Sequence, residues 1–408
     1  MCIECAADDC TRVLLDLGMP LYDEAGADYP FKTPQRATAE LLEEGVLPNV
    51  SGLYRTDPQA PQLAAIFLTH SHADHYGLAH HAHLAIPVYG SRGTVAILRD
   101  VGRVFSPHVQ IPADLRELPA GAEPVHLGAV AVTAIPVDHS AADSRAFLVE
   151  ADGERLLYTG DLRAHGRTGY LFEKLLADPR VHGIDVLLHE ATTKGRGGAD
   201  HGLWSEVRVE EELTKLAKGS PRKMVAVMTS GQNVDRLVSC YKAARKSGRL
   251  LVIDPYQAYI LRMLKDLSER IPQFTWEKVK VGMVRHQNEF LEKAGCTEVV
   301  REMQRDSVSS GAMAGEPGRY LFCARGNGKN AKLLEKVGAG KVELVWSMWS
   351  GYWSKPDCRM RVGAEVNGVT MHPIHSGGHA WPGDLDRLVA ALEPLEVRPV
   401  HTDTRDRQ

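Results

Sequence analysis

The chain has 408 residues, of which 44% are hydrophobic and 25% are charged. This composition is typical of folded globular proteins, and no apolar run approaches the roughly 20 residues that a membrane-spanning helix needs. The formal net charge of −4 excludes an overall electrostatic attraction to nucleic acid, so a polyanionic ligand would need a local basic surface or bound cations.

The first half of the chain alternates short apolar runs with helical stretches, a rhythm typical of layered α/β proteins. Six predicted strands are each followed directly by histidine or an acidic residue. They are 12–15 before Asp16, 65–69 before His70, 130–137 before Asp138 and His139, 156–160 before Asp161, 184–188 before His189 and Glu190, and 397–400 before His401. Rigid strand ends at one sheet edge hold side chains in place while loops leave room for a ligand. The pattern predicts a functional site along such an edge.

A different pattern begins near residue 204. The runs 223–229 and 249–254 predict buried parallel strands that a helix connects, and a further strand is expected at 319–324, before a glycine-rich turn and a helix. The segment 304–318, rich in Ser, Gly and Met, is expected to be a mobile loop.

These patterns predict two domains, because a chain of this length exceeds what one hydrophobic core usually organises. We expect one domain to be formed by a first segment, residues 1–203, and a return segment, residues 361–408. The second domain, residues 204–360, is expected to be an α/β domain inserted between them.

The clearest motif is His70-Ser71-His72-Ala73-Asp74-His75, directly after a predicted strand. Alternate residues His70 and His72 point to the same side of an extended backbone, whereas Asp74 and His75 turn into the next helix. Two clusters of ligands result. Imidazole and carboxylate suit zinc or a similar borderline ion, and the absence of cysteine favours a catalytic over a closed structural site. A histidine-rich turn without metal is the alternative.

Together with later motifs, the sequence resembles the metallo-β-lactamase superfamily and, within it, the β-CASP nucleases, relatives of RNase J and of the mRNA 3′-end cleavage nuclease. The superfamily motifs are matched by Leu15-Asp16-Leu17-Gly18, by His70 to His75, by His139 in Val-Asp-His-Ser and by Asp161 in Thr-Gly-Asp. The β-CASP motifs are matched by Glu190 in His-Glu-Ala-Thr, His379 in His-Ser-Gly-Gly-His-Ala and His401 in Pro-Val-His-Thr-Asp. The resemblance spans nearly the whole chain. It implies an α/β fold, a metallo-β-lactamase αββα sandwich with an inserted β-CASP α/β domain.

The resemblance implies a cofactor of two Zn²⁺ ions, with Mn²⁺ as the alternative. It assigns His70, His72 and His139 to one ion, Asp74, His75 and His401 to the other, and Asp161 to both. Asp16 would brace the ligand loop without touching metal. The implied catalytic residues are Asp74, Glu190 and His379. Two adjacent cations can activate a water molecule, and His379 could protonate the leaving oxygen if Glu190 keeps its imidazole charged.

A candidate phosphate site lies at Thr229-Ser-Gly-Gln-Asn-Val-Asp-Arg236, between a predicted strand and a helix, where backbone N–H groups and the helix dipole favour an anion. It resembles the Ser-Asn-x-x-Arg segment of RNase J relatives, which implies substrate contacts from Ser230, Asn233 and Arg236. An ordinary strand-to-helix turn is the alternative. Gly377 replaces the serine that is usual in the motif around His379, so Ser376 is expected to supply that contact.

The resemblance implies a metal-dependent phosphodiesterase that cuts nucleic acid. Nucleases of the family that prefer RNA tend to have histidine where this chain has His401, whereas the DNA-repair branch tends to have valine. We therefore expect an endonuclease acting on single-stranded RNA, with 5′-exonuclease activity as a second mode and DNA as the alternative substrate. A hydrolase of a small ester, thioester or lactone is the first rival, and it would not need Glu190, His379 or the insertion. A scaffold protein that has lost its site is disfavoured by the intact ligand series.

The seven cysteines are scattered and odd in number, which argues against a disulfide framework and fits a reducing compartment. Met1-Cys2-Ile3-Glu4-Cys5 lacks a basic segment followed by an apolar core, so a secretion signal is not expected. We expect a cytoplasmic protein with no membrane partner. The sequence leaves a homodimer open. Relatives usually have an additional strand before the first motif and, in RNase J, a further C-terminal domain, and from this sequence we expect neither.

Overall fold

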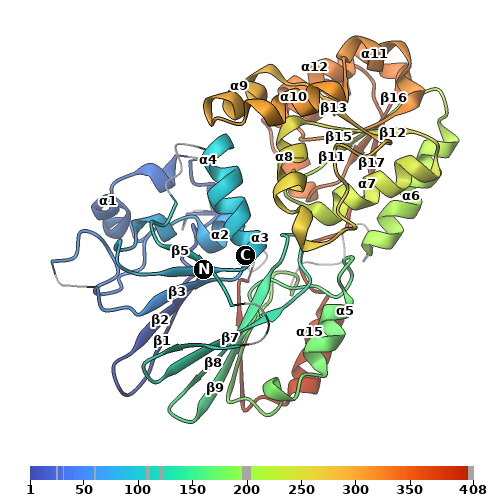
Figure 1. Ribbon diagram of the computed structural model, residues 1–408. Coiled ribbons are helices and arrows are strands. Elements are labelled where there is room, and N and C mark those ends of the chain that lie inside the picture. The colour runs from blue at the N-terminus through green and yellow to red at the C-terminus, as the bar shows by residue number, and fades with distance from the viewer. Residues whose placement is uncertain are drawn as a thin grey trace. The chain divides into compact units, whose positions relative to one another are not determined.

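The computed structural model describes residues 1–23, 26–30, 32–58, 61–106, 111–119, 121, 123–194 and 204–402. The chain divides into two compact units (Figure 1). The first unit consists of Met1–Ala164, Thr168–Arg196 and Gly378–Gln408, and the second of His165–Arg167 and Gly197–Gly377. Across the described ranges, no helix combines the length and the apolar composition needed to span a bilayer.

The described part of the first unit contains two sheets. The five-stranded sheet runs in the order β1 (Ile3–Ala6), β2 (Arg12–Leu15), β3 (Ala65–Leu68), β4 (Val88–Gly90) and β5 (Leu115–Glu117). The six-stranded sheet runs in the order β18 (Glu396–Val400), β10 (Val186–Glu190), β9 (Glu154–Tyr158), β8 (Arg145–Ala151), β7 (Val130–Pro136) and β6 (Val125–Leu127). Strands β2 to β5 are parallel to one another, as are β9, β10 and β18. Their carboxyl ends therefore lie at one edge of each sheet.

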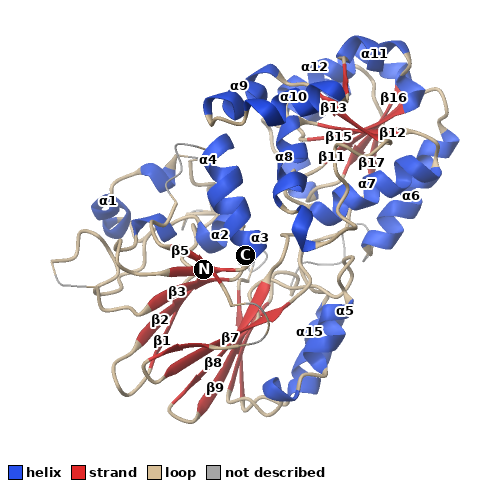
Figure 2. Ribbon diagram, in the orientation of Figure 1, coloured by secondary structure: helices blue, strands red, loops and turns tan. Residues whose placement is uncertain are grey.

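The two sheets pack face to face because side chains alternate along each strand. In β3, Phe67 joins a core shared with the second sheet, where its ring lies 5.6 Å from that of Phe147. Its neighbour Ile66 faces the opposite way and packs with Leu41 on the outer side. A third core joins Leu157 of β9 to helices on the outer side of the second sheet. The layers are therefore helix, sheet, sheet and helix (Figure 2), and the predicted αββα sandwich is confirmed.

Short helices cover the two outer faces of this sandwich. They are α1 (Thr38–Glu43), α2 (Ala73–Tyr76), α3 (Arg92–Val95), α4 (Gly102–Phe105), α5 (Tyr170–Leu176) and α15 (Pro382–Leu392). Phe172 of α5 and Leu385 of α15 are buried in the core against the second sheet. This packing fixes the strands whose ends carry the candidate site.

The second unit is built on a seven-stranded parallel sheet, as described. Its order is β14 (Ser307–Val308), β13 (Val279–Gly282), β12 (Leu250–Ile253), β15 (Tyr320–Ala324), β11 (Met224–Met228), β16 (Val342–Trp346) and β17 (Met371–Pro373). All five residues of β11 are buried, as expected of a central strand with both faces covered. The predicted inserted α/β domain is confirmed.

Helices lie on both faces of this sheet (Figure 2). They are α6 (Glu206–Gly219), α7 (Val234–Lys246), α8 (Pro255–Met263), α9 (Arg285–Lys293), α10 (Thr297–Arg305), α11 (Ser310–Gly315), α12 (Gly328–Val337), α13 (Ser350–Ser354) and α14 (Arg359–Val366). Leu334 of α12 and Met360 of α14 share one core with Phe322 of β15. Asn233 caps α7, because its side chain accepts a hydrogen bond from the Arg236 backbone.

Three expectations from the sequence are corrected. A strand does precede the first motif, because β1 pairs with β2. The second unit extends to Gly377 rather than to residue 360, because β17 pairs with β16 and so belongs to its sheet. The segment 304–318 is not a loop throughout, since it forms β14 and α11. Met313 is buried, and the Ser309 side chain caps α11 by accepting from the Ala312 backbone, so packing and capping order a segment of low propensity.

Candidate metal centre

Asp16 follows β2 and anchors the loop with the strongest motif. It is fully buried, and its φ of 59° lies in the left-handed region. Its carboxylate accepts hydrogen bonds from the Thr69 backbone N–H at 2.8 Å, from the Thr69 hydroxyl at 2.9 Å and from the Tyr158 hydroxyl at 2.8 Å. His75 donates from Nδ1 at 2.7 Å. The bracing role that the resemblance implied for Asp16 thus has a geometric basis.

A substitution tests this brace. Because partners behind a metal ligand typically contribute 10- to 100-fold to metal affinity, Asp16→Asn should weaken metal binding by about that factor. Competition with a chromophoric chelator measures it. Asp152→Asn is the control, since the Asp152 carboxylate accepts from the Asp8 backbone on the surface of the same unit. Unchanged affinity in the Asp16 variant, with native thermal stability, would show that His75 needs no such partner.

The first candidate group joins three histidines and Asp161, all with ligand atoms within 4.8 Å of one another. Nε2 of His70 lies 3.1 Å from Nδ1 of His72, and Nε2 of His139 lies 3.2 Å from the same atom. Asp161 Oδ2 is 3.8 Å from Nε2 of both His70 and His139. These residues follow β3, β7 and β9, as the sequence predicts.

The second candidate group consists of Asp74, His75, Asp161 and His401. Asp74 and His75 lie in α2, as expected, and Nε2 of His75 is 3.4 Å from Asp161 Oδ2. His401 follows β18, where its Nε2 is 3.1 Å from Asp74 Oδ2 and its Nδ1 is 3.5 Å from Asp161 Oδ1. The Thr192 hydroxyl lies 2.7 Å from Nδ1 of His401 and fixes the ring. Asp161 therefore belongs to both groups.

The third group contains Asp161, Glu190 and His379. Glu190 ends β10, is fully buried, and accepts hydrogen bonds on Oε1 from the backbone N–H groups of Leu162 and Ala380, both at 3.1 Å. Its Oε2 lies 3.0 Å from Nδ1 of His379. Burial opposes a charged imidazole, but the charges of Glu190 and Asp161 outweigh it and raise the pKa of His379 to about 9. The charged form of His379, which can donate a proton, is therefore favoured by these two carboxylates.

The donor set fits divalent cations. Burial holds the pKa of His70 and of His139 well below its usual value, so these imidazoles are neutral, the form that binds metal. Nδ1 of His139 donates to the Gly378 carbonyl at 2.6 Å, which leaves a lone pair on Nε2 toward the first group. Among the described side chains, His75 Nε2 and Asp161 Oδ1 are buried without a hydrogen-bond partner, an expensive state that a cation would relieve.

Three residues behind these groups escaped the sequence analysis. Tyr158 supports Asp16. Arg163 is fully buried, and its backbone N–H donates to the Asp138 carbonyl at 2.7 Å. At Gly378, an added Cβ would lie 2.7 Å from the Ser140 hydroxyl oxygen and 3.1 Å from His139 Cε1. A charged residue two positions after Asp161 was a usable signal for Arg163, whereas Tyr158 and Gly378 gave none that differs from ordinary core and turn residues.

The four predicted substrate-binding residues lie in the second unit. Ser230 is exposed, and Asn233 caps α7. Arg236 is fully buried and forms an ion pair with Glu206 at 2.8 Å, so its guanidinium is not a surface group. Ser376 is buried, and its hydroxyl has no hydrogen-bond partner among the residues described. Contact of these residues with a phosphate stays a prediction.

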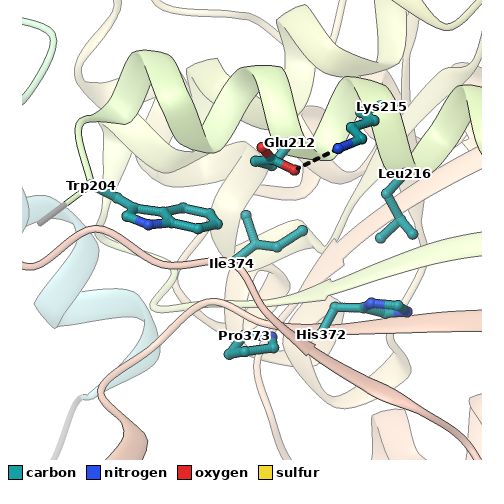
Figure 3. A pocket seen from close by; sticks show the side chains of 7 residues that line it. All are labelled: Trp204, Glu212, Lys215, Leu216, His372, Pro373 and Ile374. Carbon is teal, nitrogen blue, oxygen red and sulfur yellow. Dashed lines mark ion pairs between the residues drawn. The ribbon is translucent and has the colours of Figure 1, made fainter. Parts of the chain in front are cut away.

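The second unit also contains a cavity of about 450 Å³ with a mostly apolar lining (Figure 3). Its lining residues are Trp204, Glu212, Lys215, Leu216, His372, Pro373 and Ile374. Lys215 pairs with Glu212 at 3.9 Å, and Nε2 of His372 lies 2.9 Å from Glu343. None of the three metal-type groups lies in its lining, so we do not assign the reaction to this cavity.

Comparison with known proteins agrees with this geometry. A family model described as "Beta-lactamase superfamily domain" matches residues 48–227. Residues 48–227 therefore resemble the domain of that superfamily. The match includes the loop that supplies His70 to His75 as well as His139, Asp161 and Glu190.

Several curated proteins resemble this chain along most of its length. Ribonuclease J of Sinorhizobium meliloti is 24% identical, over 87% of this chain and 60% of that protein. Ribonuclease J of Mycobacterium tuberculosis is 24% identical over 95% of this chain and 64% of that protein, and Ribonuclease J2 of Bacillus subtilis is 24% identical over 88% and 62%. The chain thus spans less than two thirds of the length of these relatives. The resemblance to the superfamily and to RNase J is confirmed.

A solved structure resembles the whole chain. A protein of unknown function from Enterococcus faecalis V583 superposes with a TM-score of 0.75 at 21% identity, over 100% of this chain and 92% of that chain. At this identity the likeness concerns the fold alone. The likeness supports the fold described above for each unit.

Proposed function

We propose that this protein is a metal-dependent nuclease that hydrolyses phosphodiester bonds in single-stranded RNA, chiefly as an endonuclease. The observation that carries the proposal is the His379–Glu190 pair, 3.0 Å apart, in contact with the Asp161 carboxylate that both metal-type groups share. An alkoxide leaving group needs a proton, and a protonated imidazole held here can provide it. The relatives named Ribonuclease J support RNA as the substrate class.

We propose two Zn²⁺ ions as the cofactor, with Mn²⁺ as the alternative. His70, His72 and His139 would hold the first ion, Asp74, His75 and His401 the second, and Asp161 both. When bound, such ions supply Lewis-acid activation of water and neutralise charge that builds on the phosphate. The neutral imidazoles of His70 and His139 and the lack of a hydrogen-bond partner on Asp161 Oδ1 support this assignment.

The chain's own residues would guide the proton. Glu190 holds Nδ1 of His379 through one carboxylate oxygen, while two backbone N–H groups fix its other oxygen. Nε2 of His379 is then the atom that delivers a proton to the departing oxygen. The His379 side chain keeps 24% of its surface exposed, so a substrate can reach it. Asp74 stays a catalytic candidate because its carboxylate, 18% exposed, is the more open of the two aspartates in the second group.

His401 supports RNA over DNA, since histidine at this motif is typical of the RNA-preferring nucleases that the sequence resembles. DNA as a substrate and a homodimer remain predictions. We propose the cytoplasm as the location, because all seven cysteines are free, which suits a reducing compartment.

One experiment tests the proposed function. Purified protein is incubated with 5′- and 3′-labelled single-stranded RNA and DNA, with and without a chelator, beside Asp74→Ala and His379→Ala variants. We expect RNA cleavage that the chelator abolishes and that added Zn²⁺ or Mn²⁺ restores. Cleavage that resists chelation would assign the activity to a contaminant. So would cleavage by both variants at the rate of the unaltered protein. Turnover of a lactone or thioester without RNA cleavage would establish the small-ester hydrolase instead.

A further inference from the structure

The second unit contains a buried ion pair that the proposed chemistry does not use. Arg236 of α7 and Glu206 of α6 are both fully buried. The guanidinium contacts the carboxylate through two bonds, from Nε at 3.2 Å and from Nη2 at 2.8 Å. The Ser239 hydroxyl donates to the same carboxylate at 2.7 Å. The carboxylate is thus fully engaged inside this unit.

The remaining N–H groups of Arg236 hold the segment 374–377. Nη1 donates to the Ser347 carbonyl at 2.9 Å and to the Ser347 hydroxyl, which in turn donates to the Ile374 carbonyl. Nη2 donates to the Ser376 carbonyl at 3.1 Å. One arginine therefore fixes this stretch of backbone at two carbonyls, directly at Ser376 and through Ser347 at Ile374.

This stretch leads directly into the candidate metal centre. The chain passes from the second unit to the first between Gly377 and Gly378. In the first unit, the Gly378 carbonyl accepts from Nδ1 of His139, and the Ala380 backbone N–H donates to Glu190. His379 lies between these two contacts. A shift of residues 374–377 would therefore move both the proposed acid and the carbonyl that orients a proposed metal ligand.

The chain also enters the second unit at the short segment His165–Arg167, and Glu206 binds this segment as well. We call His165–Arg167 and residues 374–377 the crossing segments. The Glu206 backbone N–H donates to the His165 carbonyl at 3.0 Å. Beside it, Arg167 donates from its backbone to Asp235 at 2.8 Å and from its side chain to Glu210 at 2.7 Å. The segment His165–Arg167 begins four residues after Asp161. Residues at the N-terminal ends of α6 and α7 therefore form hydrogen bonds to both crossing segments.

Stability alone does not explain this pair. Removing two charges from water is costly, and well-packed apolar residues in place of a buried ion pair are often neutral or stabilising. What the pair supplies is geometry, because the planar guanidinium binds a carboxylate and two backbone carbonyl groups in fixed directions. The retained charges therefore point to a role in placing the backbone that they bind.

We propose that Arg236, held by Glu206, is a positioning residue for the metal centre, which acts by fixing residues 374–377 and thereby His379 and the Gly378 carbonyl. The assignment to His379 rests on the proposed function. The assignment to the Gly378 carbonyl, and through it to His139, concerns metal binding. Arg236 is then not a phosphate ligand.

The test compares Arg236→Met with Arg249→Met. Arg249 is also buried, in the same unit, and donates to the backbone carbonyls of Lys223, Tyr320, Ala217 and Ser220, none of which lies in a crossing segment. Both variants should lower the thermal midpoint. Arg236→Met should also lower kcat about 10- to 100-fold at saturating metal with little change in KM, since small misplacements cost up to about 10²-fold. Chelator competition should show metal binding weakened by about 10-fold. Arg249→Met should change neither kcat nor metal affinity.

Repeating the Arg236→Met substitution in a protein that already carries His379→Ala distinguishes a positioning role from general destabilisation. If Arg236 acts through His379, Arg236→Met should lower kcat in the otherwise unaltered protein and leave it unchanged, within about twofold, when His379→Ala is already present. A smaller folded fraction would lower the rate by the same factor in both backgrounds, and that outcome, together with unchanged metal affinity, would overturn the proposal.

A third variant covers poor folding of Arg236→Met. Arg236→Lys keeps the charge beside Glu206 but cannot bind Ser347 and Ser376 together, so it should weaken metal binding in the same direction. Unchanged metal affinity in both Arg236 variants would overturn the positioning role even if RNA is cleaved. Conversely, absence of RNA cleavage by the unaltered protein, with metal affinity lowered in the Arg236 variants, would overturn the proposed function and retain the role toward His139.

Discussion

Replacing Asp161 by asparagine should lower RNA cleavage by about a thousandfold or more and should remove most of the bound metal. The Asp161 carboxylate lies within 3.8 Å of nitrogen atoms from five histidines and belongs to all three candidate groups. Charge stabilisation by such an assembly amounts to several kcal/mol, and each 1.36 kcal/mol is a factor of about ten in rate. Loss of the shared charge therefore affects both proposed ions together.

The measurement combines elemental analysis of the purified variant with cleavage rates at saturating metal. Asp185→Asn is the matched control, because Asp185 lies just before β10, at the far end from Glu190, and accepts from the Arg155 backbone at 2.7 Å. This control should keep its metal and its rate. An Asp161→Asn protein that retains two ions and cleaves within tenfold of the unaltered rate would contradict the proposed shared ligand.

Replacing His379 by alanine should lower RNA cleavage about 10²- to 10⁴-fold, the usual contribution of a general acid, while metal content stays unchanged. The distinction from Asp161 becomes sharp with an activated diester such as bis(4-nitrophenyl) phosphate. Its leaving group departs without a proton, so His379→Ala should hydrolyse it at nearly the unaltered rate. Asp161→Asn should lose activity toward both substrates.

His182→Ala serves as the control, because His182 is an exposed histidine of the same unit that donates to the Leu176 carbonyl. It should hydrolyse both substrates normally. Equal losses on RNA and on the activated diester in His379→Ala would instead assign this histidine to the metal groups, as the third group with Asp161 and Glu190 allows.

The sequence predicted the residues at the ends of strands better than it predicted strand order and the residues that support the site. His70, Asp161 and Glu190 follow or end buried strands, and the short apolar runs are enough to recognise β3, β9 and β10. The convergence of these residues follows from parallel strands that share an edge. Strand order and the pairing of β10 with β18 depend on contacts between distant segments, which periodicity does not encode.

Arg236 shows the opposite case. Its place after a strand and at the start of a helix suggested a phosphate contact, and the local structure is indeed a capped helix start. The partner that decides its role, Glu206, is thirty residues away, and burial of the pair depends on the packing of α6 against α7. The boundary at Gly377 was missed for the same reason, since β17 becomes part of the second unit only through its pairing with β16.

The excursion of His165–Arg167 into the second unit bears on any attempt to engineer a minimal version of this protein. A graft that joins the two sides of the 204–377 stretch would leave Arg167 without Asp235, Glu210 and Ser239, its present acceptors. Arg167, whose guanidinium would then lack these acceptors, lies six residues after Asp161 in the chain. A working truncation must therefore redesign this short loop as well, for instance with a turn that needs no outside acceptor.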